Sequence, residues 1–132
     1  MVKPKIIAEI GCNHKGDIEI AKAMISTAKA YCNVDAVKFQ KRDIKSFLST
    51  SEYDAPHPVA YNSYGKTYGE HREFLEFSID QHKELKNHCA KIGIEYSSSV
   101  WDLKSAHDII SIKPLFIKVP SACNLNKKLL KV

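Results

Sequence analysis

The feature that most constrains the fold of this chain is an alternation of short β-rich runs with longer helical segments. We expect strands at residues 5–9, 36–40, 94–98 and 115–119. Near-continuous apolar strands of this kind are typical of a parallel sheet that is covered on both faces. Strand–helix repetition with mostly short connections therefore predicts a right-handed, parallel α/β arrangement.

Capping residues mark the helices between these strands, because a polar side chain at the first position and an Asn or Gly after the last one satisfy free backbone groups. The expected N-caps and helix ends are, in chain order, Asp17, Asn33, Ser78, Gly93 and Asp102. In the first helix we expect an apolar stripe at Ile20, Met24, Ala28 and Tyr31, flanked by Ala21, Ile25 and Cys32. A last helix is expected to begin at residue 125.

Residues 41–77 are different, because they show no sustained hydrophobic period and contain Pro56, Pro58, Gly65 and Gly69. Connections of this length inside a compact domain are uncommon and often functional or lid-like. We therefore expect residues 41–77 to be a long loop insertion.

The composition, with 44% apolar and 27% charged residues, is that of a soluble globular protein. No apolar run approaches the ~18 residues that a membrane span needs. The first residues lack a signal-peptide cleavage site, so we expect a cytoplasmic protein. The net charge of +5 is spread over dispersed lysines, and no nucleic-acid-binding motif is visible. We therefore expect neither a membrane nor a nucleic acid as partner.

Cysteines and histidines show no metal-binding or disulfide spacing. The four cysteines are widely separated and contain no C-x-x-C, so we expect buried, reduced thiols. The histidines have no metal-ligand spacing, and we propose no metal ligand in this chain. His14, in a polar loop after Gly11, is expected to be structural.

Polar residues at the carboxyl ends of the strands decide between an open sheet and a barrel. No G-x-G-x-x-G follows the first strand, which disfavours a dinucleotide-binding sheet. In a (β/α)8 barrel the catalytic residues come from these strand ends, because the following loops form one shared mouth. The candidates are Glu9, Lys38, Gln40, Ser98, Ser99, Lys118 and Ser121.

Lys38 and Lys118 each lie inside an otherwise apolar strand, where a lysine is costly to bury without a partner. Such a lysine can extend to solvent or pair with Glu9. Two lysines on neighbouring strands at one rim favour instead a site for a ligand with several negative charges, completed by serine hydroxyls. Glu9 has two open interpretations, an interior ion-pair partner or a general acid/base. A Schiff-base lysine, as in an aldolase, is a further alternative.

Five motifs, in order and over nearly the whole chain, resemble those of the N-acetylneuraminate (sialic acid) synthase family, which includes the legionaminic and pseudaminic acid synthases. They are IAEIGCNHKGD at residues 7–17, AVKFQK at 36–41, GKTYGEH at 65–71, YSSSVWD at 96–102 and FIKVPSA at 116–122. The resemblance implies a (β/α)8-barrel transferase that condenses phosphoenolpyruvate with an N-acetylmannosamine-type sugar and releases phosphate.

Carried over by position, the resemblance gives roles to six residues. Glu9 matches an acidic residue near metal and substrate, and Gln40 matches one that faces the sugar. The positions that match phosphoenolpyruvate-holding residues are Lys38, Ser99, Lys118 and Ser121. The resemblance also implies Mn2+ or Mg2+ in the complete enzyme, with its histidine ligands outside this chain.

Two departures from the family stand out. Pro120-Ser121-Ala122 replaces a Gly-Ser-Gly turn, which makes the backbone less permissive. The chain has 132 residues, about half of the ~250 of a closed barrel. We therefore expect residues 1–132 to be the truncated N-terminal half of a barrel, with about four βα units and open sheet edges.

Such a half-barrel is expected to be inactive alone, and to form a homo-oligomer or pair with a chain that supplies the second half. The alternative is a non-catalytic remnant that acts through self-association or partner binding at its unfinished sheet.

Overall fold

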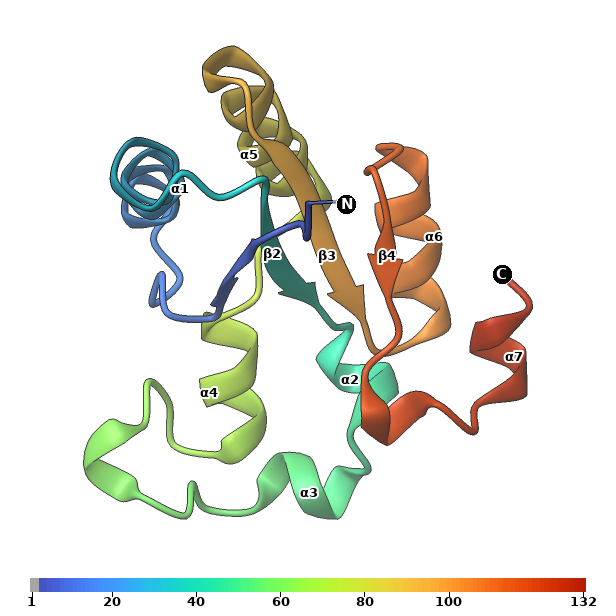
Figure 1. Cartoon of the computed structure of the whole chain (residues 1–132). Coiled ribbons are helices and arrows are strands. Elements are labelled where there is room, and N and C mark those ends of the chain that lie inside the picture. Colours follow the sequence, from blue (N-terminus) through green and yellow to red (C-terminus); the bar gives the residue numbers. More distant parts are fainter. Residues whose placement is uncertain (1–2) are drawn as a thin grey trace.

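The structure, a computed structural model, describes residues 3–132 and is built on one four-stranded parallel sheet (Figure 1). The strands are β1 (Ile7–Gly11), β2 (Ala36–Lys41), β3 (Glu95–Val100) and β4 (Ile117–Lys118). They lie in the order β1-β2-β3-β4. This arrangement confirms the predicted α/β class with parallel strands.

All four strands differ from the predicted bounds by one or two residues at one or both ends. β1 begins at Ile7 and continues to Gly11, because the ladder to β2 pairs Ile7 with Ala36 and reaches Gly11 opposite Phe39. β4 has only two residues, and only Ser98 and Ser99 of β3 pair with it. Among the described residues β1 and β4 each have one neighbouring strand.

Helices pack against the sheet through a common apolar core. They are α1 (Ile18–Cys32), α5 (Ile79–Ile92) and α6 (Leu103–Ser111). Ile25, Leu85 and Ile109, one from each helix, are fully buried in the same cluster as Phe39 and Tyr96 of the sheet. The chain then continues through the 3-10 helix η2 (Ser121–Cys123) into the short helix α7 (Lys127–Leu130).

The predicted caps are confirmed. Asp17 accepts hydrogen bonds from the backbone of Glu19 and Ile20 at 2.8 and 3.1 Å. Ser78 forms a capping box with Gln81, and Asp102 accepts from Ser105 N at 2.8 Å. Helices α1 and α5 end at Asn33 and Gly93, both left-handed.

The apolar stripe predicted for α1 is confirmed in part, because the buried face is centred on its flanking residues. Its buried residues are Ala21, Ile25 and Ala28, whereas Ile20 and Tyr31 are exposed. All four cysteines are free thiols, but only Cys89 and Cys123 are buried. The expectation of buried thiols is therefore wrong for the exposed Cys32 and only partly met by Cys12.

The segment 41–77, expected as an irregular loop, contains several short helices. They are α2 (Ile44–Phe47), α3 (Thr50–Asp54), the 3-10 helix η1 (Ala60–Asn62) and α4 (Tyr68–Phe74). These helices are too short to give a visible period, and they are set by caps such as the Ser49–Glu52 capping box. The segment extends beyond the carboxyl ends of the strands (Figure 1).

None of the helices described between residues 3 and 132 combines the length and apolar character that a membrane crossing requires.

Two histidines are part of the core behind the sheet. His14 stacks on Phe77 with ring centroids 4.0 Å apart, and its Nδ1 accepts from Gly16 N at 3.1 Å. His82 is fully buried and its Nδ1 lies 2.6 Å from the hydroxyl of Tyr96. Burial lowers the pKa of His14 to about 4 and that of His82 to about 3. Both rings are therefore neutral in the folded protein at pH 7. The burial of His14 and its stacking on Phe77 fit the structural role predicted for it.

These pKa values predict a loss of stability in mild acid. Each histidine takes up a proton near pH 6.5 in the unfolded chain but only at much lower pH in the folded chain. The free energy of unfolding should thus fall as the pH drops below about 6.5, by up to about 1.4 kcal/mol per pH unit for each histidine. Urea unfolding between pH 7 and pH 4.5 measures this slope.

His14→Gln and His82→Gln should each reduce the slope, because glutamine does not titrate. His107→Gln changes an exposed histidine and should leave the slope as it is. Equal slopes in all three variants would show that the buried histidines do not cause the acid sensitivity.

Candidate functional site

The alternation of side chains along β2 and β3 gives the sheet two chemically different faces. Val37 and Phe39 of β2 point into the core, together with Tyr96 and Val100 of β3. The residues between them point to the opposite face, which is polar. That face carries Glu9, Lys38, Gln40, Ser97, Ser99 and Lys118.

Lys38 is the centre of this polar face and is only 8% exposed. Its ammonium group forms an ion pair with the Glu9 carboxylate on β1, and Glu9 lies opposite Lys38 in the strand register. The same ammonium donates to Ser99 Oγ at 3.2 Å. The structure therefore confirms one of the two predicted surroundings of Glu9, the ion pair with a lysine.

Gln40, Ser99 and Lys118 lie in register across β2, β3 and β4. Lys118 is exposed, and Ser121, at the start of η2, is exposed as well. The two lysines do share one end of the sheet, but the expectation that their strands are neighbours is wrong, since β3 lies between them. With strands ~4.8 Å apart, Gln40 and Lys118 are separated by roughly 10 Å at their backbones.

The serines of β3 divide between the two faces. Ser98, a candidate from the sequence, points into the core and donates to the backbone carbonyl of Ser99 at 3.2 Å. Ser97 Oγ donates to the Phe116 carbonyl at 2.8 Å and so ties β3 to the start of β4. Ser99 accepts from Lys38, and its own hydroxyl proton is available to a ligand. Of the three, Ser99 is the one suited to binding.

The sequence analysis missed a second cluster at the same end of the sheet, formed by Arg42, Glu76 and Trp101. Arg42 Nη1 donates to Glu76 Oε1 at 3.0 Å, and both side chains are 9% exposed. The guanidinium carbon lies 4.3 Å from the centroid of the Trp101 ring. Burial raises the pKa of Glu76, while the charge of Arg42 opposes that rise. The available signals were a basic pair after the second strand and the chain's single tryptophan.

A cavity of about 530 Å³ opens beside Trp101, but none of the predicted site residues lines it. It is lined by Asp43, Ser46, Phe47, Trp101, Asp102, Leu103, Lys104, Ala122, Cys123 and Asn126. Opposite charges meet across it, with Lys104 Nζ 3.3 Å from Asp43 Oδ1. We place the candidate site at Lys38, because the charge there is buried and lies on the polar face of the sheet.

Within residues 3–132 no three His, Cys, Asp or Glu side chains come together in a way that could hold a metal ion. The resemblance places the histidine ligands of Mn2+ or Mg2+ outside this chain, so the metal stays a prediction for the complete enzyme.

Comparison with known proteins identifies the family. A sequence model of the NeuB family matches residues 24–132. The chain belongs to the NeuB family. It is 44% identical over 116 residues to the N-acetylneuraminate-9-phosphate synthase of Mus musculus, an alignment that covers 88% of this chain and 32% of the mouse protein.

Two further proteins extend the comparison. The chain is 34% identical over 131 residues to the N,N'-diacetyllegionaminic acid synthase of Campylobacter jejuni, covering 99% of this chain and 39% of that one. A putative spore coat polysaccharide biosynthesis protein E from Chromobacterium violaceum superposes with a TM-score of 0.80 at 23% identity, over 98% of this chain and 37% of that one. The structural likeness supports the partial-barrel fold. The chain spans about a third of the length of the curated relatives it matches.

The ion pair at the site predicts an asymmetric response to mutation. Glu9→Gln leaves the buried ammonium of Lys38 without a counter-charge and should cost about 1–3 kcal/mol of unfolding free energy. Lys38→Met removes the buried charge itself and leaves Glu9, whose side chain is 51% exposed, free to be hydrated. This variant should lose less stability than Glu9→Gln, or gain some. Urea unfolding at pH 7 measures the free energy of unfolding of both variants. A larger loss for Lys38→Met would contradict the interpretation that the buried charge of Lys38 lowers the stability of the fold.

Proposed function

We propose that these residues form the phosphoenolpyruvate-holding part of an enzyme that condenses phosphoenolpyruvate with N-acetylmannosamine or a related 2-acetamido sugar. The product is a nine-carbon, sialic-acid-type sugar, and phosphate is released. The observation that carries this proposal is a buried lysine beside a serine hydroxyl on the polar face of the sheet, in a chain of the NeuB family. The sequence resemblance matches both positions to phosphoenolpyruvate-holding residues.

In the proposed complex the lysines neutralise the ligand's negative charges. Phosphoenolpyruvate carries a phosphate and a carboxylate, and charge-assisted hydrogen bonds to both are stronger than neutral ones. Lys38 supplies one cation and Lys118 the other, two strands apart on the same polar face. Ser99 and Ser121 donate their hydroxyl protons to the remaining oxygens. Lys38 exchanges part of its contact with Glu9 for the ligand.

The proposed reaction joins two carbons and breaks one C–O bond. The enol carbon of phosphoenolpyruvate attacks the aldehyde carbon of the open-chain sugar, and a water molecule adds to the adjacent carbon. The phosphate then leaves with its bridging oxygen. We assign Glu9 the role of general base, which takes one proton of that water once Lys38 turns to the ligand and passes it to the former aldehyde oxygen. The second proton of the water leaves with the phosphate. Gln40, on the same face, is assigned to the sugar.

We further propose that these 132 residues do not catalyse the reaction alone, because they correspond to about a third of the length of each curated relative. The other candidate function is partner binding through the sheet edge. It is favoured by an apolar groove of about 420 Å³ beside β4. Its lining includes Val100, Ile110, Phe116, Val119 and Leu129.

A phosphate-release assay with phosphoenolpyruvate, N-acetylmannosamine and Mn2+ tests these proposals. The chain alone should release no phosphate. The chain mixed with a polypeptide comprising the rest of the mouse relative should release it, provided that both fold and associate. Turnover by the chain alone would contradict the inactivity proposal, and a folded, associated but inactive mixture would favour the non-catalytic binding role.

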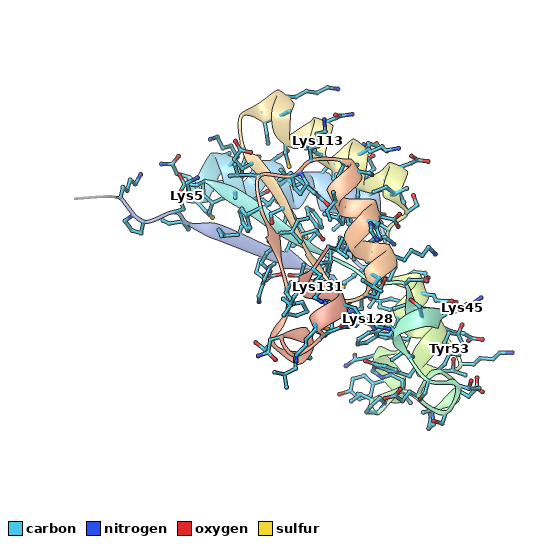
Figure 2. All side chains as sticks on the ribbon, turned by 90° about the vertical axis from the view of Figure 1, so that its right-hand side faces the viewer. Lys5, Lys45, Tyr53, Lys113, Lys128 and Lys131 are labelled. Atoms are coloured by element: carbon cyan, nitrogen blue, oxygen red, sulfur yellow. The ribbon has the colours of Figure 1, made fainter. Side chains whose placement is uncertain are left out.

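Lysine variants in the active mixture test the assignment of the site. Lys38→Met should lower the rate by at least about a hundredfold, as expected for the loss of one preorganised charge. Lys113→Met is the matched control, because Lys113 precedes β4 at the amino ends of the strands, away from Lys45 and Tyr53 of the segment beyond their carboxyl ends (Figure 2). Equal rates in the two variants would exclude Lys38 from the binding site.

A further inference from the structure

Arg42 is a buried arginine whose contacts lead to the proposed sugar-facing residue. It follows β2 directly, and its guanidinium lies between the ring of Trp101 and the carboxylate of Glu76. Glu76 Oε2 also accepts from the backbone N–H of Arg42 at 3.0 Å. The arginine is therefore held by its backbone and its side chain at once, and its direction is fixed.

The remaining arm of this guanidinium contacts Gln40. Arg42 Nη2 donates to Gln40 Oε1, two residues earlier in the chain. A guanidinium has five N–H donors and no acceptor, whereas a glutamine amide has an oxygen on one side and an NH2 group on the other. The oxygen of Gln40 must therefore face Arg42, and the NH2 group must face away from it.

The space around Gly11 shows where that NH2 group lies. A Cβ atom built on Gly11 would be 3.4 Å from Gln40 Nε2 and 3.6 Å from Glu9 Oε1. These are ordinary van der Waals distances, so it is the φ of +57° at Gly11 that favours glycine here. The N–H donors of Gln40 thus point along the polar face toward the end of β1, beside Glu9.

We infer that Arg42 is a positioning residue that fixes the Gln40 amide with its N–H donors toward the substrate space. The identity of the ligand in this inference rests on the proposed function, whereas the orientation of the Gln40 amide does not. The substrate group recognised at Gln40 is then a hydrogen-bond acceptor, such as a hydroxyl or carbonyl oxygen of the sugar. An amide with a fixed orientation discriminates against a ligand that lacks the matching group.

Arg42→Lys tests the inference with little risk to folding, because lysine keeps a positive charge near Glu76 but lacks the second donor arm. Arg72→Lys is the matched control. Arg72 Nη2 is 3.8 Å from the same Glu76 oxygen, and no hydrogen bond joins Arg72 to Gln40 in the described residues. The double variant Arg42→Met/Glu76→Met removes both buried charges together and gives the same test without an unpaired carboxylate.

The measurement is the NMR order parameter of the Gln40 side-chain NH2 group in the 132-residue chain. We expect a high order parameter in the unchanged chain and in Arg72→Lys, and one below about 0.6, the range of flexible groups, in Arg42→Lys and in the double variant. A Gln40 amide that stays ordered in either folded Arg42 variant would overturn the inference.

Titration with N-acetylmannosamine separates this inference from the proposed function. In the unchanged chain the Gln40 NH2 signals should shift with added sugar, and the Kd should rise about tenfold in Arg42→Lys and stay constant in Arg72→Lys. An amide that is ordered by Arg42 but does not respond to the sugar would count against the proposed substrate, while the positioning role would still stand.

Discussion

The period of two along β2 and β3 is the constraint on which the rest of the structure depends. Because consecutive side chains point to opposite faces, one strand can contribute Val37 and Phe39 to the apolar core and Lys38 and Gln40 to a polar surface. A shift of one residue in the register would bury the amide and the ammonium under the helices. The core therefore fixes the chemistry of the opposite face.

Removing charged side chains from water at this end of the sheet costs free energy, which their ion-pair and hydrogen-bond partners offset. Lys38 is removed from water and is compensated by Glu9 and Ser99, and Arg42 is compensated by Glu76. Buried ion pairs of this kind rarely add stability compared with apolar side chains. Their presence at the carboxyl ends of parallel strands, in a chain of the NeuB family, is consistent with binding rather than folding as the reason for them.

Much of the fold could be predicted from the sequence, because its signals are local. Asp17, Ser78 and Asp102 begin helices where expected, and Asn33 and Gly93 end them in the left-handed conformation. The segment 41–77 could not be predicted in this way. Its helices have three to seven residues, and two of them begin at caps that leave no hydrophobic period in the sequence.

Only part of the candidate site could be predicted, because only part of it leaves a local pattern in the sequence. Lys38 and Gln40 were visible as polar residues within or at the end of an apolar strand. The partnership of Arg42 with Glu76 joins residues 34 positions apart and leaves no local pattern. The order of the strands also had to come from the structure, and it places β3 between the two lysines.

The most direct test of the account is an NMR titration of the 132-residue chain with phosphoenolpyruvate, following the backbone amides and the lysine side chains. The account predicts that the changes gather on Lys38, Ser99, Lys118 and Ser121, and that they disappear in Lys38→Met. Changes confined to exposed lysines on the helices, or none at millimolar ligand, would contradict the assignment of the polar face as a phosphoenolpyruvate site.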